Sequence, residues 1–156
     1  MSMKKREIYI ASDHAGFELK EILKKFLFEE NYDIEDLGAY EFDPDDDYPD
    51  YAVKVCEKVL ETDGKGILIC DSGQGMDKVA NKIPGIYAEV CWDEYTAKHA
   101  KEHSNVNVLC LGGKTVEPEL AKNMVKIWLE LPFIPKERHV RRINKIKGIE
   151  KKYMKK

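Results

Sequence analysis

The stretch ILICDSGQGMDKVANK, residues 67–82, places a thiol and a hydroxyl beside glycines. An apolar run ends in Cys70, and Ser72, Gly73 and Gly75 lead into a segment with helical spacing. The N-terminus of a helix offers unpaired N–H groups and a positive partial charge, which lower a thiol pKa and can hold an oxyanion. Such a group could remove a proton next to a carbonyl or transfer an acyl group. The competing interpretation is a buried cysteine before a tight turn, and these residues alone leave both open.

A carboxylate and an imidazole stand together in SDHAG, directly after the apolar segment 7–11. Asp13 is suited to cap a helix N-terminus, and His14 follows it. Gly16 within the first helical turn indicates that another part of the chain approaches the backbone closely. His103, at the end of a further helical segment, supplies a second imidazole. We expect these side chains and Cys70 to meet on one edge of the fold.

The hydrophobic pattern predicts the scaffold that would position these residues. Strands are predicted at 7–11, 33–38, 66–70, 86–91 and 106–112, and helices at 17–30, 51–61, 75–83, 94–103, 118–131 and from 135 onward. Strands that alternate with helices predict an α/β fold with a five-stranded parallel sheet covered on both faces. Ligands bind at the carboxyl ends of the strands in such sheets, and the candidate residues follow those ends.

Composition limits the class of protein. The 156 residues fit one domain over 1–156, and 43% hydrophobic with 35% charged residues is enough for a core and a soluble surface. Apolar runs of about five residues are far short of the roughly 20 that cross a bilayer, and the first residues lack the apolar stretch of a signal peptide. The four cysteines show no paired spacing, so we expect a cytoplasmic protein without disulfides or zinc.

The charge is unevenly distributed. The whole chain carries −3, and residues 136–156 hold ten basic and two acidic residues, so this tail carries +8 and the remainder −11. A basic tail indicates a solvated terminal helix, a phosphate-bearing ligand or a nucleic acid. Nucleic acid is disfavoured because the acidic body would repel the polymer and Tyr153 is the tail's one aromatic residue.

Three other segments resemble ligand-binding motifs but lack residues that those motifs require. The Gly-Lys-Thr at 113–115 lacks the earlier glycine of a phosphate-binding loop. The acidic run 43–47 lacks the later glycine and glutamate of a calcium loop, so a solvated loop is expected. His99 and His103 lie one helical turn apart, but no third metal ligand can be named. No metal site is predicted.

Several motifs together resemble the ribose-5-phosphate isomerase B family, which also contains the galactose-6-phosphate isomerase subunits. They are ASDHAGFELKEIL, DYPDYA, GILIC with the following SG, GM and ANKIPGI, KEHSNVNVLCLG and RHVRRI, and they run from about residue 7 to 146. The resemblance implies a Rossmann-like three-layer α/β/α fold without metal or organic cofactor. It also implies a homodimer or tetramer with active sites at the subunit interface, where the basic helix of about 135–152 packs on a partner.

The resemblance further implies that ribose 5-phosphate and ribulose 5-phosphate are interconverted through a cis-enediolate. By matching motif, Cys70 would be the base that removes the C2 proton, and Ser72 would shuttle protons between the sugar oxygens. His103 would open the sugar ring, and Asp13 would bind a sugar hydroxyl or the ring oxygen. The binding roles fall to His14, Arg138 and Arg142 at the phosphate, to Tyr48 in the sugar pocket, and to the N–H groups of residues 71–75, with Gly73 and Gly75, at the enediolate.

The sequence departs from the family's pattern near the ligand. Asp71 stands where the family has Gly, and a carboxylate there would raise the thiol pKa unless it pairs with a cation. Ser104 stands where Asn is usual, Lys114 stands where Arg is usual, and Tyr87 stands where Arg is frequent. These changes leave two alternatives open. One is an isomerase of another sugar phosphate, of the galactose 6-phosphate or allose 6-phosphate type, and the other is a weakly active sugar-phosphate-binding homologue.

Overall fold

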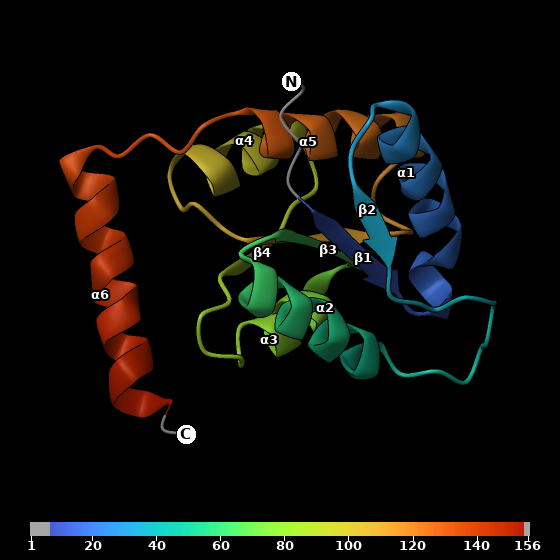
Figure 1. Ribbon diagram of the computed structural model, residues 1–156, viewed down its shortest axis with the longest axis horizontal. Helices are drawn as coiled ribbons and strands as arrows, with labels where there is room; N and C mark the ends of the chain where they lie inside the picture. The colour runs from blue at the N-terminus through green and yellow to red at the C-terminus, as the bar shows by residue number, and fades with distance from the viewer. Residues whose placement is uncertain (1–6, 155–156) are drawn as a thin grey trace.

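A five-stranded parallel sheet forms the centre of the protein (Figure 1), and the computed structural model describes residues 7–154. The strands lie in the order β2-β1-β3-β5-β4, and each neighbouring pair is parallel. They are β1 (Ile8–Ser12), β2 (Ile34–Asp36), β3 (Lys65–Cys70), β4 (Ala88–Val90) and β5 (Val108–Gly112). Every residue of β1 and β5 is buried, as expected for strands covered on both faces. The predicted sheet is confirmed.

Helices cover both faces of the sheet and form two separate cores. The first face is covered by α1 (Phe17–Glu29), α4 (Glu94–Glu102) and α5 (Pro118–Glu130), and the second by α2 (Tyr48–Thr62) and α3 (Gln74–Ala80) (Figure 1). Trp128 is fully buried in the first core, and Cys56 is fully buried in the second. The predicted three-layer α/β/α arrangement is confirmed.

The boundaries of some elements differ from those predicted. Helix α2 begins at Tyr48, three residues earlier than predicted, with Pro49 in its first turn, where the missing N–H leaves no bond unmade. Strands β2 and β4 span three residues each, within the longer predicted segments 33–38 and 86–91. Both are edge strands with one neighbour, and edge strands in natural sheets are often short.

The predicted tail helix is present as α6 (Glu137–Tyr153), which stands apart from the two helical layers, beyond α4 in Figure 1. His139, near its start, is buried. Its opposite end is tied to the body because Glu150 accepts hydrogen bonds from the Tyr87 hydroxyl at 2.6 Å and from the Gly85 N–H at 2.7 Å. Helix α6 therefore reaches the rest of the chain at both of its ends.

The composition led to expectations about membrane spans and about the cysteines, which the structure addresses. Within residues 7–154, no helix has both the length and the apolar character needed to pass through a bilayer. The four cysteines are all free thiols, and all four are buried. The first six residues, which were expected not to form a signal peptide, lie outside the described part of the chain.

Candidate active site

The carboxyl ends of β1 and β3 lie side by side at the point where the order of the sheet reverses, since β2 flanks β1 on one side and β3 on the other. Ligands of open α/β sheets bind in the crevice at this point. A cavity of about 790 Å³ opens there. It is lined by Asp13, His14, Ala15, Phe17, Glu18, Phe42, Asp71 and Lys114. We call the side of the sheet where the strands end its carboxyl edge, and the opposite side its amino edge.

Asp13 caps a single 3-10 turn, η1 (His14–Gly16), which begins the connection to α1. Its Oδ1 accepts the Gly16 N–H at 3.1 Å. Burial raises the pKa of Asp13, against the lowering effect of that hydrogen bond and of His14. A Cβ added to Gly16 would lie 2.5 Å from the carbonyl oxygen of Ile69 in β3, so the predicted close approach is confirmed. This approach brings Asp13 against the end of β3.

His14 is held by a carboxylate from a distant loop. Its Nδ1 lies 2.7 Å from Asp46 Oδ1, and its backbone N–H donates to the same oxygen at 3.1 Å. The hydrogen bond with Asp46 raises the pKa of His14. The Asp46 side chain is only 6% exposed, so the prediction of a solvated loop at 43–47 is wrong for this residue. Nothing in the acidic run marks Asp46, because its burial depends on a contact with η1.

Cys70 lies at the carboxyl end of β3, as predicted, with 4% of its surface exposed. It packs within the core formed by α2 and α3. Its neighbour Asp71 lines the cavity and turns toward Lys114, with 3.3 Å between Lys114 Nζ and Asp71 Oδ1. The thiol is therefore close to the cavity but largely covered, and a cation partly compensates the carboxylate beside it.

The glycines after Cys70 shape a tight entry into α3. Gly73 caps the helix with a φ of 81°, a conformation that favours glycine. A Cβ on Gly75 would lie 2.6 Å from the Tyr48 ring, so Tyr48 closes over this turn. The Ser72 hydroxyl accepts the Gln74 N–H at 3.3 Å. The Gln74 N–H, one of the groups expected to hold the enediolate, is thus already hydrogen-bonded to Ser72, the expected proton shuttle.

His103 and Ser104 lie away from this cavity. Helix α4 runs back across the sheet, so its C-terminal cap His103 comes just before β5 begins. Cys70 instead pairs in register with Gly112 at the far end of β5. At about 3.3 Å per residue, the two ends of β5 are about 13 Å apart. The expectation that His103 and Cys70 lie at the same edge of the sheet is wrong within a single chain, because a helix between parallel strands returns the chain to the amino edge.

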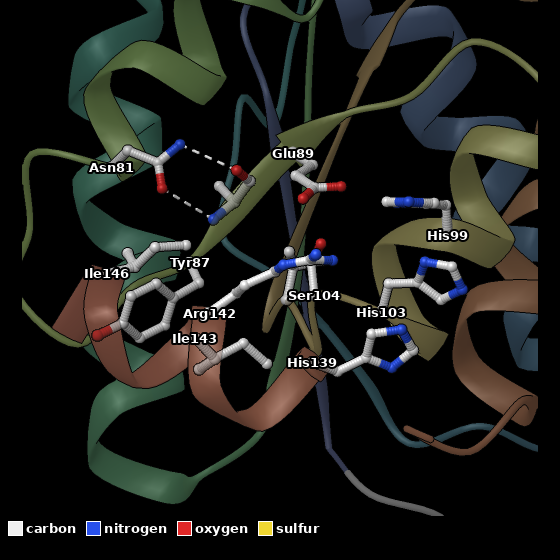
Figure 2. Close-up of a pocket in the computed structure, with 12 residues that line it drawn as sticks. Asn81, Tyr87, Glu89, His99, His103, Ser104, His139, Arg142, Ile143 and Ile146 are labelled. Carbon is white, nitrogen blue, oxygen red and sulfur yellow. Dashed lines mark hydrogen bonds between the residues drawn. The ribbon is translucent and has the colours of Figure 1, made fainter. Parts of the chain in front are cut away.

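A second cavity, of about 270 Å³, lies between α6 and the β4 side of the sheet (Figure 2). Its polar lining includes His103, Ser104 and Arg142, whose side chain reaches inward from α6. The full lining is Asn81, Tyr87, Ala88, Glu89, His99, His103, Ser104, Val106, His139, Arg142, Ile143 and Ile146. The remaining predicted phosphate ligand, Arg138, is exposed on the same helix.

Three imidazoles form a row beside this second cavity (Figure 2). The ring centroids of His99 and His103 are 4.2 Å apart, and those of His103 and His139 are 4.3 Å apart. Burial lowers the pKa of His103, and the charges of His99 and His139 act in the same direction. His103 is therefore favoured as a neutral imidazole, which can accept a proton.

Two titratable residues of the second cavity, Glu89 and His139, were not singled out from the sequence. Glu89 is a carboxylate within a short, otherwise apolar strand segment, and burial raises its pKa. His139 lies between the residues already noted in RHVRRI. Two signals in the sequence would have identified them. Glu89 is a charged residue inside an apolar strand, and His139 is a histidine beside two candidate arginines.

Residues 8–146 match the Ribose/Galactose Isomerase family, which is nearly the whole chain. The chain belongs to this family. Family membership confirms both the resemblance and the expected enzyme class, a sugar isomerase that interconverts aldoses and ketoses.

Solved structures of the family share the fold throughout. The ribose-5-phosphate isomerase B of Clostridium thermocellum is 40% identical with a TM-score of 0.89, covering 94% of this chain and 99% of that one. The Mycoplasma genitalium enzyme, crystallised with bound ribulose-5-phosphate, is 41% identical with a TM-score of 0.88, covering 93% and 96%. In sequence, the ribose-5-phosphate isomerase B of Mycolicibacterium paratuberculosis is 36% identical over 138 residues, 88% of this chain and 87% of that protein.

Proposed function

We propose that the protein interconverts ribose 5-phosphate and ribulose 5-phosphate at an active site assembled from two copies of the chain. The observation that carries this proposal is the separation of the candidate residues into two groups. Asp13, His14 and Cys70 lie at the carboxyl edge, whereas His103 and Arg142 line the cavity under α6. A two-fold dimer that sets the carboxyl edge of one copy against the α6 side of the other would complete two equivalent sites.

The carboxyl edge would carry out the proton transfers on carbon. The Cys70 thiolate takes the C2 proton of the open-chain aldose, and the electron pair forms the enediolate. Ser72 moves a proton between the two sugar oxygens, and Cys70 returns its proton to C1 to give the ketose. The Lys114 ammonium beside Asp71 supports this assignment, because it reduces the repulsion between the Asp71 carboxylate and a thiolate.

The α6 side of the partner would open the sugar ring and bind the phosphate. A neutral His103 can take the proton of the ring hydroxyl and return it to the ring oxygen, and its lowered pKa favours that form. Arg138 and Arg142 on α6, together with His14 across the interface, would provide charge-assisted hydrogen bonds to the phosphate. The solved Mycoplasma genitalium structure with bound ribulose-5-phosphate supports this substrate. No step of this scheme calls for a metal or an organic cofactor.

Mixing two inactive variants tests the shared site. Cys70→Ala and His103→Ala are each expected to lose conversion of ribose 5-phosphate. After dissociation and reassembly of equal amounts, half of the dimers are mixed and one of their two sites is intact, so about a quarter of the wild-type activity should return. Cys91→Ala, which removes another buried thiol next to a strand, is the matched control and should remain active.

Two results would contradict the proposal. Wild-type turnover by Cys70→Ala would remove this residue from its role as the base. Mixed dimers that form, as shown by mass spectrometry of differently tagged chains, yet recover no activity would mean that the two residues do not meet in a shared site.

Isomerisation of a six-carbon sugar phosphate is the second candidate function. It is favoured by the Asp71–Lys114 pair, which replaces a glycine and an arginine of the family's usual pattern at the cavity that would hold the sugar. Turnover of a panel of pentose and hexose phosphates separates the two functions. Tight binding of a sugar phosphate without turnover would instead indicate a binding homologue.

A further inference from the structure

The structure assigns to Asp46 a positioning role: it holds the Nδ1 side of His14, so that the cationic ring offers Nε2–H to a phosphate in the cavity at the carboxyl edge. This inference rests on the proposed function for the identity of the phosphate ligand. The contact between Asp46 and His14 stands independently of it.

The geometry fixes the orientation of the imidazole. One oxygen of Asp46, Oδ1, receives both the side chain of His14 at 2.7 Å and its backbone N–H at 3.1 Å. Two contacts to one oxygen restrain the residue at its backbone and at its ring. The ring of Phe42 meets His14 edge to face, with centroids 6.1 Å apart. Since Nδ1 is occupied by Asp46, Nε2 is the ring nitrogen left for a ligand in the cavity that His14 lines.

The charge of the pair follows from burial. The Asp46 side chain is 6% exposed, and a buried carboxylate is stable as an anion only when a cation or several donors satisfy it. His14 Nδ1 lies 2.7 Å from Asp46 Oδ1, and the two residues form an ion pair when the ring is protonated. A neutral His14 with its proton on Nδ1 would present a bare, accepting Nε2, which a phosphate oxygen cannot use. A doubly protonated His14 satisfies Asp46 on one side and donates to phosphate on the other.

The surroundings of His14 within one copy of the chain favour a charged ring. Acidic groups predominate around the ring, so a neutral His14 would leave this copy's side of the site less favourable for a phosphate. Asp13, Asp43 and Asp46 act directly on the ring. The other charged residues that line the cavity in the described part of the chain are Glu18, Asp71 and the cation Lys114. Asp46, Asp13 and Asp43 all favour the protonated imidazole. The acidic loop therefore assists anion binding through His14, although its own charge is negative.

The test compares Asp46→Asn with Asp45→Asn, which removes the same charge from the exposed neighbouring residue. The pKa of His14, followed by NMR of the imidazole, should fall clearly in Asp46→Asn and stay unchanged in Asp45→Asn. Asp46→Glu, which restores a carboxylate, should recover much of the shift. An unchanged His14 pKa in a folded Asp46→Asn protein would overturn the assignment.

Binding provides a second readout. For Asp46→Asn, the Kd of inorganic phosphate and the KM of ribose 5-phosphate should rise about tenfold near pH 8, as expected for one lost charge-assisted hydrogen bond. The rise should shrink near pH 5.5, where His14 is protonated in either protein, and kcat should change little. An equal rise at both pH values would show a structural defect and would reject the positioning role.

These readouts separate the inference from the proposed function. The NMR titration and the binding of inorganic phosphate need no turnover. A wild-type protein that fails to isomerise ribose 5-phosphate would refute the proposed function, while a shifted His14 pKa together with pH-dependent phosphate binding would still support the role of Asp46.

Discussion

The Tyr87 hydroxyl donates a hydrogen bond to Glu150, with 2.6 Å between the phenol oxygen and Oε2. The other carboxylate oxygen of Glu150 accepts the Gly85 N–H at 2.7 Å. Burial raises the pKa of Tyr87 to about 12, with Glu150 acting in the same direction, so the phenol remains a donor at neutral pH. The segment before β4 thus secures the end of α6, the helix that carries Arg142 to the second cavity.

Replacing Tyr87 by Phe should loosen α6 without unfolding the sheet. A hydrogen bond to a charged acceptor contributes about 1.5–3 kcal/mol, so the amides of residues 137–153 should exchange with solvent about tenfold faster or more. Hydrogen exchange measured by mass spectrometry checks this, with α2 as the internal reference. Tyr153→Phe removes an exposed phenol from the same helix and should leave the rates unchanged. Equal exchange in Tyr87→Phe and wild type would contradict the role of this hydrogen bond.

Alanine at two glycines should have opposite effects on stability. At Gly16 the new Cβ would lie 2.5 Å from the Ile69 carbonyl oxygen, so the backbone must shift at a cost of about 1–3 kcal/mol in the free energy of unfolding. At Gly148, within α6, nothing lies within 4 Å of the new Cβ, and alanine should stabilise that helix by up to about 1 kcal/mol. Urea unfolding measures the first effect and hydrogen exchange of α6 the second. A neutral Gly16→Ala would show that η1 does not depend on its close contact with β3.

The fully buried ammonium of Lys20 donates to Asp36 Oδ2 at 2.7 Å and to the Ala39 carbonyl at 2.8 Å. Lys20→Met removes this donor, but Lys24 Nζ remains 2.9 Å from the same Asp36 oxygen, so the loss should cost about 1–3 kcal/mol at neutral pH. Lys25→Met, at an exposed site on the same helix, should cost little. Urea unfolding of the three proteins at pH 7 checks this difference.

The same pair predicts a dependence on acid. Burial alone would raise the pKa of Asp36, but the hydrogen bonds from Lys20, the Gly38 N–H and Lys24 outweigh it and lower the pKa. A lowered carboxyl pKa stabilises the fold above the unfolded value of about 3.9 and loses this effect as the pH falls through the folded value. The stability difference between wild type and Lys20→Met should therefore narrow toward about pH 3. A constant difference from pH 7 to that acidity would contradict the assignment.

Asp71→Gly should keep or raise activity on ribose 5-phosphate. The substitution removes the carboxylate beside Cys70 and releases Lys114, 3.3 Å away, for a phosphate. Both side chains are more than half exposed, so their ion pair adds at most about 1 kcal/mol to stability. Steady-state kinetics of Asp71→Gly and Asp71→Asn provide the measurement. A severe loss of kcat/KM in both would mean that Asp71 itself binds or activates the substrate.

Local sequence patterns predicted the parts of the fold that depend on local physics. The apolar runs at 66–70 and 106–112 indicated β3 and β5 because strands buried on both faces have no polar positions. Gly16 indicated a close backbone contact, since only a residue without Cβ fits there. These inferences need no knowledge of distant partners.

The parts that depend on distant contacts were not predicted. Asp46 stands in an acidic run like its neighbours, and only the contact with His14, 32 residues earlier, buries it. The location of His103 at the amino edge was implied by the alternation of strands and helices, because each helix between parallel strands must return the chain across the sheet. The helical pattern of residues 94–103 placed His103 at the end of a helix. The expectation that His103 and Cys70 share one edge ignored the return of the chain across the sheet.

The five-residue strand β5, with Cys70 beside one end and His103 just before the other, has a consequence for kinetics. If the site is shared between two copies as proposed, one copy in isolation would not bring both groups to the same carbon skeleton. At extreme dilution, where dimers are scarce, the observed rate should therefore grow with the square of the protein concentration. Specific activity should become constant only at concentrations where nearly all chains are dimeric.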